Sequence, residues 1–243
     1  MELISLIALV VFVGAFTQGL AGFGFAFFAL PILSFFMDFK VAVVLLVILA
    51  QILNVMILWF HKVRPDWKLL LKLTVVTLPG IPVGVYMLRF FPVPFLQGSL
   101  GVTLILFALY QWFFHPRPRE LGKAWVAVAG FLAGVLGGSL NSQGPPIMLY
   151  AALQPWDKDK VKATLIGYFF VSGILVIIVQ AAQGLMSMEI MRLSAWCLPV
   201  LLLGAFAGRL AYVRLGEGGY RHVFTALLLA LGAMMIVRSS GMI

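Results

Sequence analysis

Eight long stretches of the sequence carry no charged residue and no histidine, and this pattern constrains the fold more than any other feature. The stretches are 3–37, 41–60, 73–88, 90–114, 124–156, 163–188, 193–208 and 223–237. A helix that spans a membrane needs about 20 apolar residues. Hydrophobic residues make up 63% of the chain and charged residues only 10%, unlike a soluble domain. The sequence therefore predicts an all-α polytopic membrane protein.

The first and fifth stretches are too long for single spans. Their 35 and 33 residues would form helices of about 50 Å at about 1.5 Å per residue, against a hydrocarbon core of about 30 Å. The same two stretches contain glycine-rich runs that end in proline, and both residue types break helices. We expect two half-length helices in each stretch. The alternative is one long tilted helix with an interfacial end.

The two glycine-rich runs repeat each other. An offset of 115 aligns Phe16 with Phe131, Gly19 with Gly134, Gly22 with Gly137 and Pro31 with Pro146. Later in each half, an offset of 120 aligns Leu78-Pro79 with Leu198-Pro199, Gly84 with Gly204 and Arg89 with Arg209. Paired helix breaks in a duplicated membrane chain indicate a transport site.

The repeat divides the chain into two halves. The first repeat is 1–115, with a hairpin at 3–37 and spans at about 41–60, 73–91 and 93–114. A basic linker occupies 116–123. The second repeat is 124–243, with a hairpin at 124–156 and spans at about 161–186, 193–213 and 220–238.

The basic residues test whether the two long stretches cross the membrane. If all eight stretches cross, the 17 lysines and arginines divide 9 to 8 between the faces. If the first and fifth are re-entrant hairpins, 13 gather on one face, and the other keeps only Lys40, Arg89, Arg192 and Arg238. The positive-inside rule favours the second arrangement. It places both termini outside and gives the halves inverted topology. It also explains the net charge of +9 without nucleic acid.

A helix that begins in mid-membrane points unpaired N–H groups at the break, which favours an anion there. We predict fourteen substrate-binding residues. They are Thr17, Gln18, Gly22 and Gly24 at the first break; Ser139, Asn141, Ser142, Gln143, Gly144 and Pro145 at the second; and Gln51, Asn54, Thr164 and Tyr168 on neighbouring spans. The alternative is that these small and polar residues only let helices pack and bond to each other.

The placement of the acidic residues and histidines favours an anionic substrate over a cationic one. All eight acids lie in or beside predicted loops, and no histidine lies at membrane depth. Arg89 and Arg209 either attract an anion at the mouths of a pathway or extend to lipid headgroups. Gln180 is predicted to be interfacial. A single cysteine, Cys197, makes no metal site, and we predict no catalytic residue and no cofactor. The expected partners are a small anion and the lipid bilayer, with a homodimer left open.

Three segments resemble the TauE/SafE family of sulfite and organosulfonate permeases, also called the toluenesulfonate uptake permease family. They are FTQGLAGFGFAFFALPIL, AGFLAGVLGGSLNSQGPPIMLYAAL and KATLIGYFFVSG. The resemblance implies a multi-pass carrier of the bacterial inner membrane for small sulfur-containing anions such as sulfite, thiosulfate or organosulfonates. It also implies that the two breaks hold the substrate between them.

Four other functions stay open from the sequence. An anion channel and a carrier of small carboxylates would use the same donors, and a membrane assembly factor would bind no solute. An intramembrane enzyme would need a base beside Ser139 in Gly137-Gly138-Ser139, and none lies at that depth in the sequence. The anion, the direction of transport and the coupling ion are not determined by the sequence.

Overall fold

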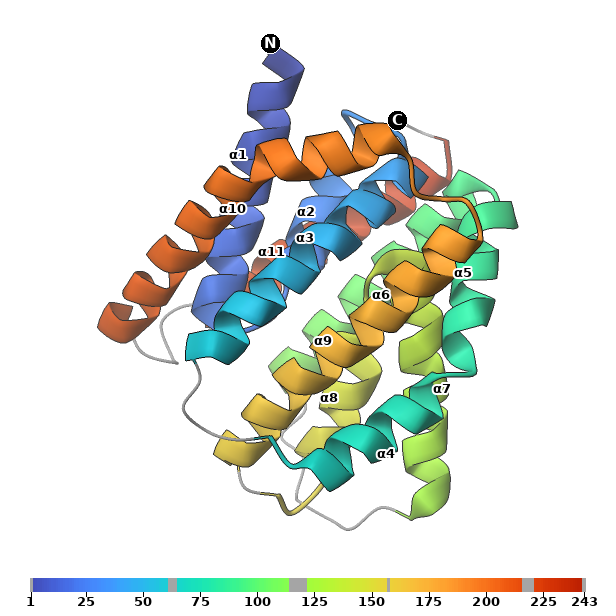
Figure 1. Cartoon of the computed structure of the whole chain (residues 1–243), viewed down its shortest axis with the longest axis vertical. Coiled ribbons are helices and arrows are strands. Elements are labelled where there is room, and N and C mark those ends of the chain that lie inside the picture. Colours follow the sequence, from blue (N-terminus) through green and yellow to red (C-terminus); the bar gives the residue numbers. More distant parts are fainter. Residues whose placement is uncertain (1, 61–64, 114–121, 157, 216–220, 242–243) are drawn as a thin grey trace. The chain divides into compact units, whose positions relative to one another are not determined.

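The computed structural model describes residues 2–60, 65–113, 122–156, 158–215 and 221–241. Within these ranges the secondary structure consists of eleven helices (Figure 1). They are α1 (Glu2–Ala21), α2 (Phe25–Leu33), α3 (Phe39–Phe60), α4 (Trp67–Thr77), α5 (Gly80–Phe90), α6 (Val93–Phe113), α7 (Lys123–Leu140), α8 (Gly144–Ala152), α9 (Lys158–Ala182), α10 (Met188–Leu215) and α11 (Arg221–Ser239). The all-helical fold class is confirmed. Most of the predicted linker 116–123 lies outside the described residues.

The helices form two compact units. Unit 1 contains Met1–Leu49, Phe91–His115 and Ser187–Ile243, and unit 2 contains Ala50–Phe90 and Pro116–Met186. In unit 1, α1 packs against α10, and α11 packs against α2 and α6. In unit 2, α7 packs against α4, α5 and α8, and α9 packs against α4 and α5. Each unit therefore combines helices from both halves of the sequence, and the halves as inverted repeats stay a prediction.

Both long uncharged stretches are broken, as the glycine-rich runs predicted. The first breaks between α1 and α2, where Gly22 and Gly24 have φ of 80° and 103°. A methyl group on Gly14 would touch Phe25 and Ala29, so α2 folds back along α1. The prediction of two half-length helices in each stretch is wrong, however, because the two arms differ in length. The first arms α1 and α7 have 20 and 18 residues, while α2 and α8 have nine each.

The predicted span 73–91 is two helices rather than one. Helix α4 begins after Asp66, whose carboxylate accepts the N–H groups of Lys68 and Leu69 at 3.0 and 3.1 Å. It ends at Thr77, and α5 continues at an angle of 45°. Pro79 lies between them, and a proline has no N–H to continue the ladder of hydrogen bonds.

In unit 2, helices α5 and α7 meet through glycine. A methyl group on Gly80 would overlap the carbonyl oxygen of Phe131, and one on Gly84 would overlap that of Val135. The residue numbers rise together along the two helices, so they run parallel. Gly80 and Gly84 are four residues apart, the small-xxx-small spacing that lets membrane helices approach closely.

In unit 1, helices α1 and α10 meet in the same way. A methyl group on Gly204 would overlap the carbonyl oxygen of Phe12, and one on Gly208 would overlap that of Phe16. These helices also run parallel, because the residue numbers of the contacts again rise together. Backbone therefore lies against backbone at this crossing in unit 1 as it does between α5 and α7 in unit 2.

The two crossings correspond residue by residue. Gly19 lies against Ala205 as Gly138 lies against Ile81. At every such contact, the residue number in α7 exceeds that of its counterpart in α1 by 119, and the residue number in α10 exceeds that of its counterpart in α5 by 124. The sequence offsets of 115 and 120 are therefore about one helical turn too short. Glycines recur every three or four residues in these helices, so the sequence alone aligns neighbouring turns almost equally well.

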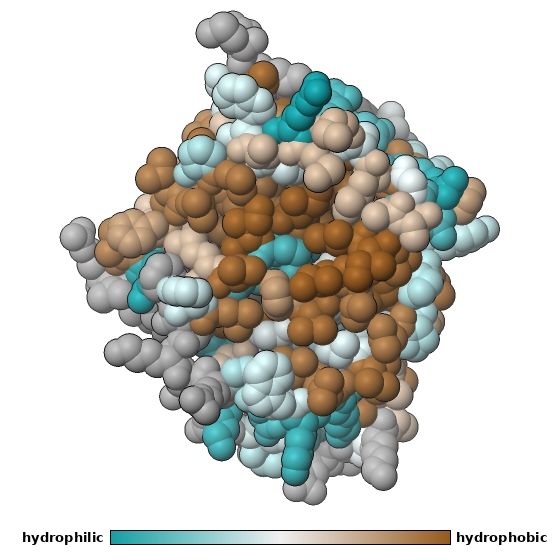
Figure 2. All heavy atoms as spheres, in the orientation of Figure 1, coloured by the Kyte–Doolittle hydropathy of each residue, from teal (hydrophilic) through white to brown (hydrophobic). Residues whose placement is uncertain are grey.

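The surface of the units suits lipid. Four described helices are long and apolar enough to cross a membrane, or five if the bent pair α4–α5 counts as one span. Large apolar side chains such as Trp59, Leu106 and Leu203 are more than half exposed. Figure 2 shows hydrophobic atoms over much of the visible surface, with hydrophilic side chains where α4 begins.

Replacing a crossing glycine should destabilise the protein. We expect Gly84→Ala and Gly208→Ala each to lower the free energy of unfolding by about 1–3 kcal/mol, because an added methyl group forces the backbones apart. The measurement is the thermal unfolding midpoint in detergent. Gly122→Ala is the control, because nothing lies within 4 Å of an added methyl group there. Equal midpoints in all three variants would contradict the packing model.

Candidate functional site at the helix breaks

The break between α7 and α8 is closed by two backbone hydrogen bonds. The N–H of Asn141 donates to the carbonyl of Gly137 at 3.1 Å, and the N–H of Ser142 donates to the carbonyl of Leu136 at 3.0 Å. Asn141 has φ of 52°, and no other non-glycine among the described residues has a positive φ. Asparagine adopts this left-handed conformation more readily than most residues, so its presence favours a helix end here.

Helix α8 opens with Gly144, Pro145 and Pro146, and no side chain caps it. A helix start normally attracts an anion through its unpaired N–H groups. Proline has no N–H, so among these three residues only Gly144 offers one. An anion at this break would therefore depend on side-chain donors more than on the backbone.

The two serines at the break have already used their protons. Ser139 Oγ donates to the carbonyl of Val135 at 2.6 Å, and Ser142 Oγ donates to the carbonyl of Leu140 at 3.0 Å. A hydroxyl has one proton, so neither serine can donate to a ligand without losing its present bond. By contrast, Nδ2 of Asn141 is buried and has no partner within the described part of the chain. Asn141 thus keeps a spare donor at the break.

Gln143 ties the break to α9. Its Nε2 donates to the carbonyl of Phe169 at 3.3 Å, and its Oε1 lies 3.1 Å from Ser172 Oγ. Ser172 also lies 2.7 Å from the carbonyl of Tyr168, and its single proton cannot serve both acceptors fully. The attachment of Gln143 is therefore long and incompletely satisfied.

Tyr168 and Thr77 form a second polar contact in the interior of unit 2. Thr77 Oγ1 donates to the carbonyl of Leu73 at 2.8 Å and lies 2.9 Å from the Tyr168 hydroxyl. Because the threonine proton is used, Tyr168 is the donor in their contact. Tyr168 is fully buried in a core cluster formed by α4, α7, α8 and α9. Its role in the observed structure is to join α9 to α4.

Thr164 also has a structural role. Its hydroxyl donates to the carbonyl of Lys160 at 2.7 Å and accepts the N–H of Asp66 at 2.9 Å. Asp66 is the residue that caps the start of α4. Thr164 therefore fixes the beginning of α4 against α9, rather than facing the break.

Gln51 and Asn54 are both buried on α3. The amide of Gln51 lies directly on the backbone of Gly173 in α9, where a methyl group would overlap it. The Oε1 atom of Gln51 is buried, and no described residue bonds to it. Gln51 and Gln143 thus reach the same turn of α9, between Phe169 and Gly173.

The first break, in unit 1, has a different character. The hydroxyl of Thr17 donates to the carbonyl of Val13 at 2.8 Å, and the carbonyl of Gln18 accepts the N–H of Gly22 at 2.7 Å. Aromatic rings surround this break, with the Phe23 ring packed edge-on against Phe107 and Phe224 at 5.9 and 5.7 Å. No side chain caps α2 at Gly24. The first break thus offers backbone donors in an apolar setting.

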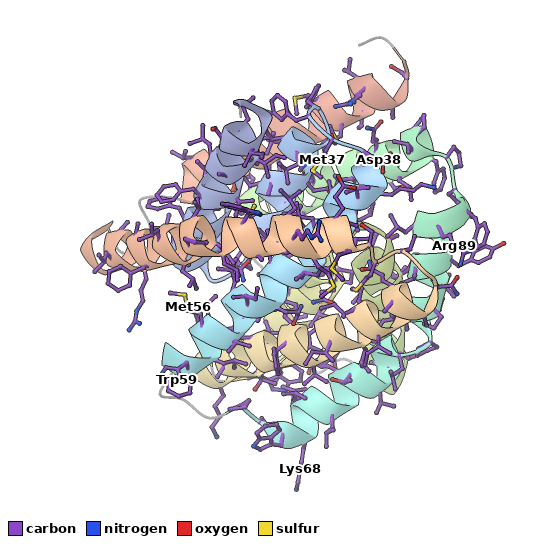
Figure 3. All side chains as sticks on the ribbon, turned by 45° about the horizontal axis from the view of Figure 1, so that its top comes forward. Met37, Asp38, Met56, Trp59, Lys68 and Arg89 are labelled. Carbon is purple, nitrogen blue, oxygen red and sulfur yellow. The ribbon has the colours of Figure 1, made fainter. Side chains whose placement is uncertain are left out.

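The two arginines lie apart from the breaks in sequence. Arg89 Nη1 donates to the carbonyl and Oε1 of Gln183 at 2.6 and 2.9 Å, just beyond the end of α9. Figure 3 shows Arg89 at the edge of unit 2. The positive charge of Arg89 is stabilised there, because the carbonyl end of a helix carries a partial negative charge. Arg209 is exposed on α10.

Five further polar residues among the described part of unit 2 are buried but were not predicted as site residues. They are Thr74, Thr77, Gln154, Ser172 and Gln180. Gln180, expected at the interface, has no exposed surface. The available signal was the spacing of four residues along α9 from Thr164 to Tyr168 and Ser172. Among the described residues, no three His, Cys, Asp or Glu side chains gather as a metal site would require.

Comparison with known proteins decides the family. The model of the sulfite exporter TauE/SafE family matches residues 6–235, nearly the whole chain. The chain belongs to the TauE/SafE family. It is 25% identical over 177 residues, covering 71% of this chain and 69% of the relative, to a Cupriavidus necator protein named "Probable sulfite/organosulfonate exporter TauE". No solved structure matches. Membership supports a membrane transporter with a small anionic substrate.

The structural role of Thr164 can be measured by a matched pair of variants. Thr164→Val should lower the free energy of unfolding by about 1–3 kcal/mol, because the N–H of Asp66 loses its acceptor. Thr103→Val is the control, since Thr103 donates to the carbonyl of Ser99 within its own helix. Thermal unfolding of both variants gives the comparison. Equal losses would show that the contact between Thr164 and Asp66 contributes nothing.

Proposed function

We propose that this protein is a secondary transporter of small sulfur-containing anions, such as sulfite, thiosulfate or organosulfonates, in the bacterial inner membrane. The observation that carries the proposal is the spare amide donor of Asn141 at a broken helix. Gln143 and Gly144 follow Asn141 by two and three residues at the start of α8, in a chain of the sulfite exporter family. These groups are neutral donors, and the oxygens of a sulfite or sulfonate group are acceptors.

The depth of the break supports this position for the site. Helix α8 has nine residues, so the break lies about 14 Å from the turn that follows this helix, at about 1.5 Å per residue. That distance is about half of a hydrocarbon core of about 30 Å. In unit 1, the nine residues of α2 place Gly22 and Gly24 at a similar depth below the charged turn at Asp38.

The incomplete attachment of Gln143 gives the site a means of responding to substrate. An anion that accepts from Nε2 would replace the carbonyl of Phe169, which this atom now reaches at 3.3 Å. Hydrogen bonds to a charged acceptor are about twice as strong as those to a neutral one. The exchange would release α8 from α9 at Gln143 while Asn141 and Gly144 hold the anion.

The other predicted residues take different parts in this proposal. In unit 1, Thr17, Gln18, Gly22 and Gly24 would offer an anion the N–H groups at the start of α2. In unit 2, Gln51 and Asn54 would face the break, while Thr164 and Tyr168 support it. The re-entrant hairpins, the inverted topology and the positions of Arg89 and Arg209 at pathway mouths remain part of the proposal.

Small carboxylates are the second candidate substrate. The donors at the break are uncharged and few, and a carboxylate presents acceptor oxygens of the same kind. An enzymatic role for Ser139 has little support, because its hydroxyl proton is held by the carbonyl of Val135. The choice between sulfonate and carboxylate therefore rests on binding measurements.

The test combines ligand-dependent stabilisation with transport. We expect sulfite or sulfonates to raise the unfolding temperature of the purified protein by mass action. Asn141→Ala and Gln143→Ala should remain inserted and lose transport in proteoliposomes. Each removes a hydrogen bond to a charged group, which is equivalent to about tenfold or more in affinity. Gly144→Leu should be worse, because its side chain blocks close approach to the backbone.

Two controls sharpen this test. Asn141→Gly keeps a residue that accepts a positive φ and removes only the amide, so it should fail as Asn141→Ala does. Ser99→Ala removes an exposed hydroxyl that bonds only to the carbonyl of Phe95 and should transport normally. Wild-type transport by Asn141→Ala and Gln143→Ala would refute the site, and stabilisation by carboxylates alone would reassign the substrate.

A further inference from the structure

Helix α9 carries a buried ridge of polar residues along one line. Every fourth residue from 164 to 180 is almost inaccessible: Thr164, Tyr168, Ser172, Val176 and Gln180 are 0, 0, 0, 1 and 0% exposed. Four of the five are polar. Residues four apart are neighbours on a helix surface, so the ridge is continuous apart from Val176. A buried polar ridge in a membrane helix either bonds to other helices or lines a polar path.

The first three polar members of the ridge bond to other elements of unit 2. Thr164 accepts the N–H of Asp66, Tyr168 contacts Thr77, and Ser172 contacts Gln143. These bonds explain why the residues are polar, since each joins α9 to another part of unit 2. Packing therefore accounts for the ridge as far as Ser172.

Gln180 does not fit this explanation. Both its Oε1 and its Nε2 are buried and have no hydrogen-bond partner among the residues that the structure describes. A buried polar group without a partner is costly, whereas an apolar side chain of the same shape would carry no such cost. The amide therefore indicates a partner outside the described contacts of unit 2.

The position of Gln180 indicates what that partner is. It lies three residues before Gln183, which holds the guanidinium of Arg89. In the other direction, Ser172, which contacts the Gln143 amide, is eight residues away, or about 12 Å along the helix. Gln180 thus lies along α9 between a positive charge at the edge of the unit and the α7–α8 break.

We propose that Gln180 is a second contact for the transported anion, between Arg89 and the break. Building on the proposed function, the anion first meets the Arg89 charge and then accepts a hydrogen bond from Nε2 of Gln180. Oε1 of Gln180 accepts a hydrogen bond from an O–H group of the anion or from a water molecule that moves with the anion. Val176 separates this contact from Ser172, so the anion occupies two distinct positions along α9.

The first test separates a functional amide from a structural one. Gln180→Met keeps the approximate shape and removes the orphaned polar atoms. We expect the unfolding temperature without ligand to rise, and the rate of radiolabelled sulfite transport at low concentration to fall about tenfold. Gln97→Met, the same change at a buried glutamine of α6, should leave transport unchanged. A higher unfolding temperature with unchanged transport would overturn the proposal, as would a lower unfolding temperature, since the amide would then have a partner within the chain.

The second test measures access directly and does not depend on transport. In a Cys197→Ala background, Gln180→Cys should react with a sulfonate-bearing methanethiosulfonate reagent, and methanesulfonate should slow the reaction. Ile178→Cys, on an exposed apolar position of the same helix, should not react, because lipid excludes the charged reagent. An unreactive Cys at 180 would refute the second contact. Reaction and protection at 180, together with normal transport by Asn141→Ala, would instead refute the site at the break.

Discussion

Direct contact between helix backbones at a few glycines holds each unit of this protein together. Lipid is as apolar as a leucine side chain, so burying apolar surface cannot drive membrane helices together, and close packing must do so. Gly80 and Gly84 bring α5 onto α7, and Gly204 and Gly208 bring α10 onto α1. These crossings support the broken helices, because α1 and α7 are the long arms that carry the breaks. A rigid long arm with a short returning arm holds the break at a fixed depth.

The distribution of protons within unit 2 separates residues that support the structure from those that can bind a ligand. Hydroxyls such as those of Ser139 and Thr77 give their single proton to a carbonyl nearby in their own chain segment. Amides have more donors and acceptors than their neighbours can use. Among the described residues of unit 2, buried atoms without a partner belong to the amides of Gln51, Asn141, Gln154 and Gln180 and to one hydroxyl, that of Thr74. Neutral amides bind an anion weakly enough for it to leave again, which suits a transporter better than a storage site.

The sequence predicted the breaks but not the contacts that surround them. Glycine and proline act on the local backbone, so the breaks within the two glycine-rich runs followed from composition and spacing. The partners of Gln143 and Thr164 lie on helices distant in sequence, and no local pattern reveals them. The register of the repeat was one turn short because glycines recur at each turn. Gln180 lies near a helix end in the sequence, and only tertiary packing determines that it is buried.

The exchange of helices between the halves has a consequence for biosynthesis. Unit 2 ends at Met186, whereas α1 needs α10, which begins at Met188. At about 5–20 residues per second, the nascent chain waits about 10–40 s between completing α1 and completing its partner. During that time the glycine face of α1 is in lipid or against the insertion machinery. The last helices to leave the ribosome therefore complete the packing of the first, and a chain truncated before α10 would leave unit 1 unassembled.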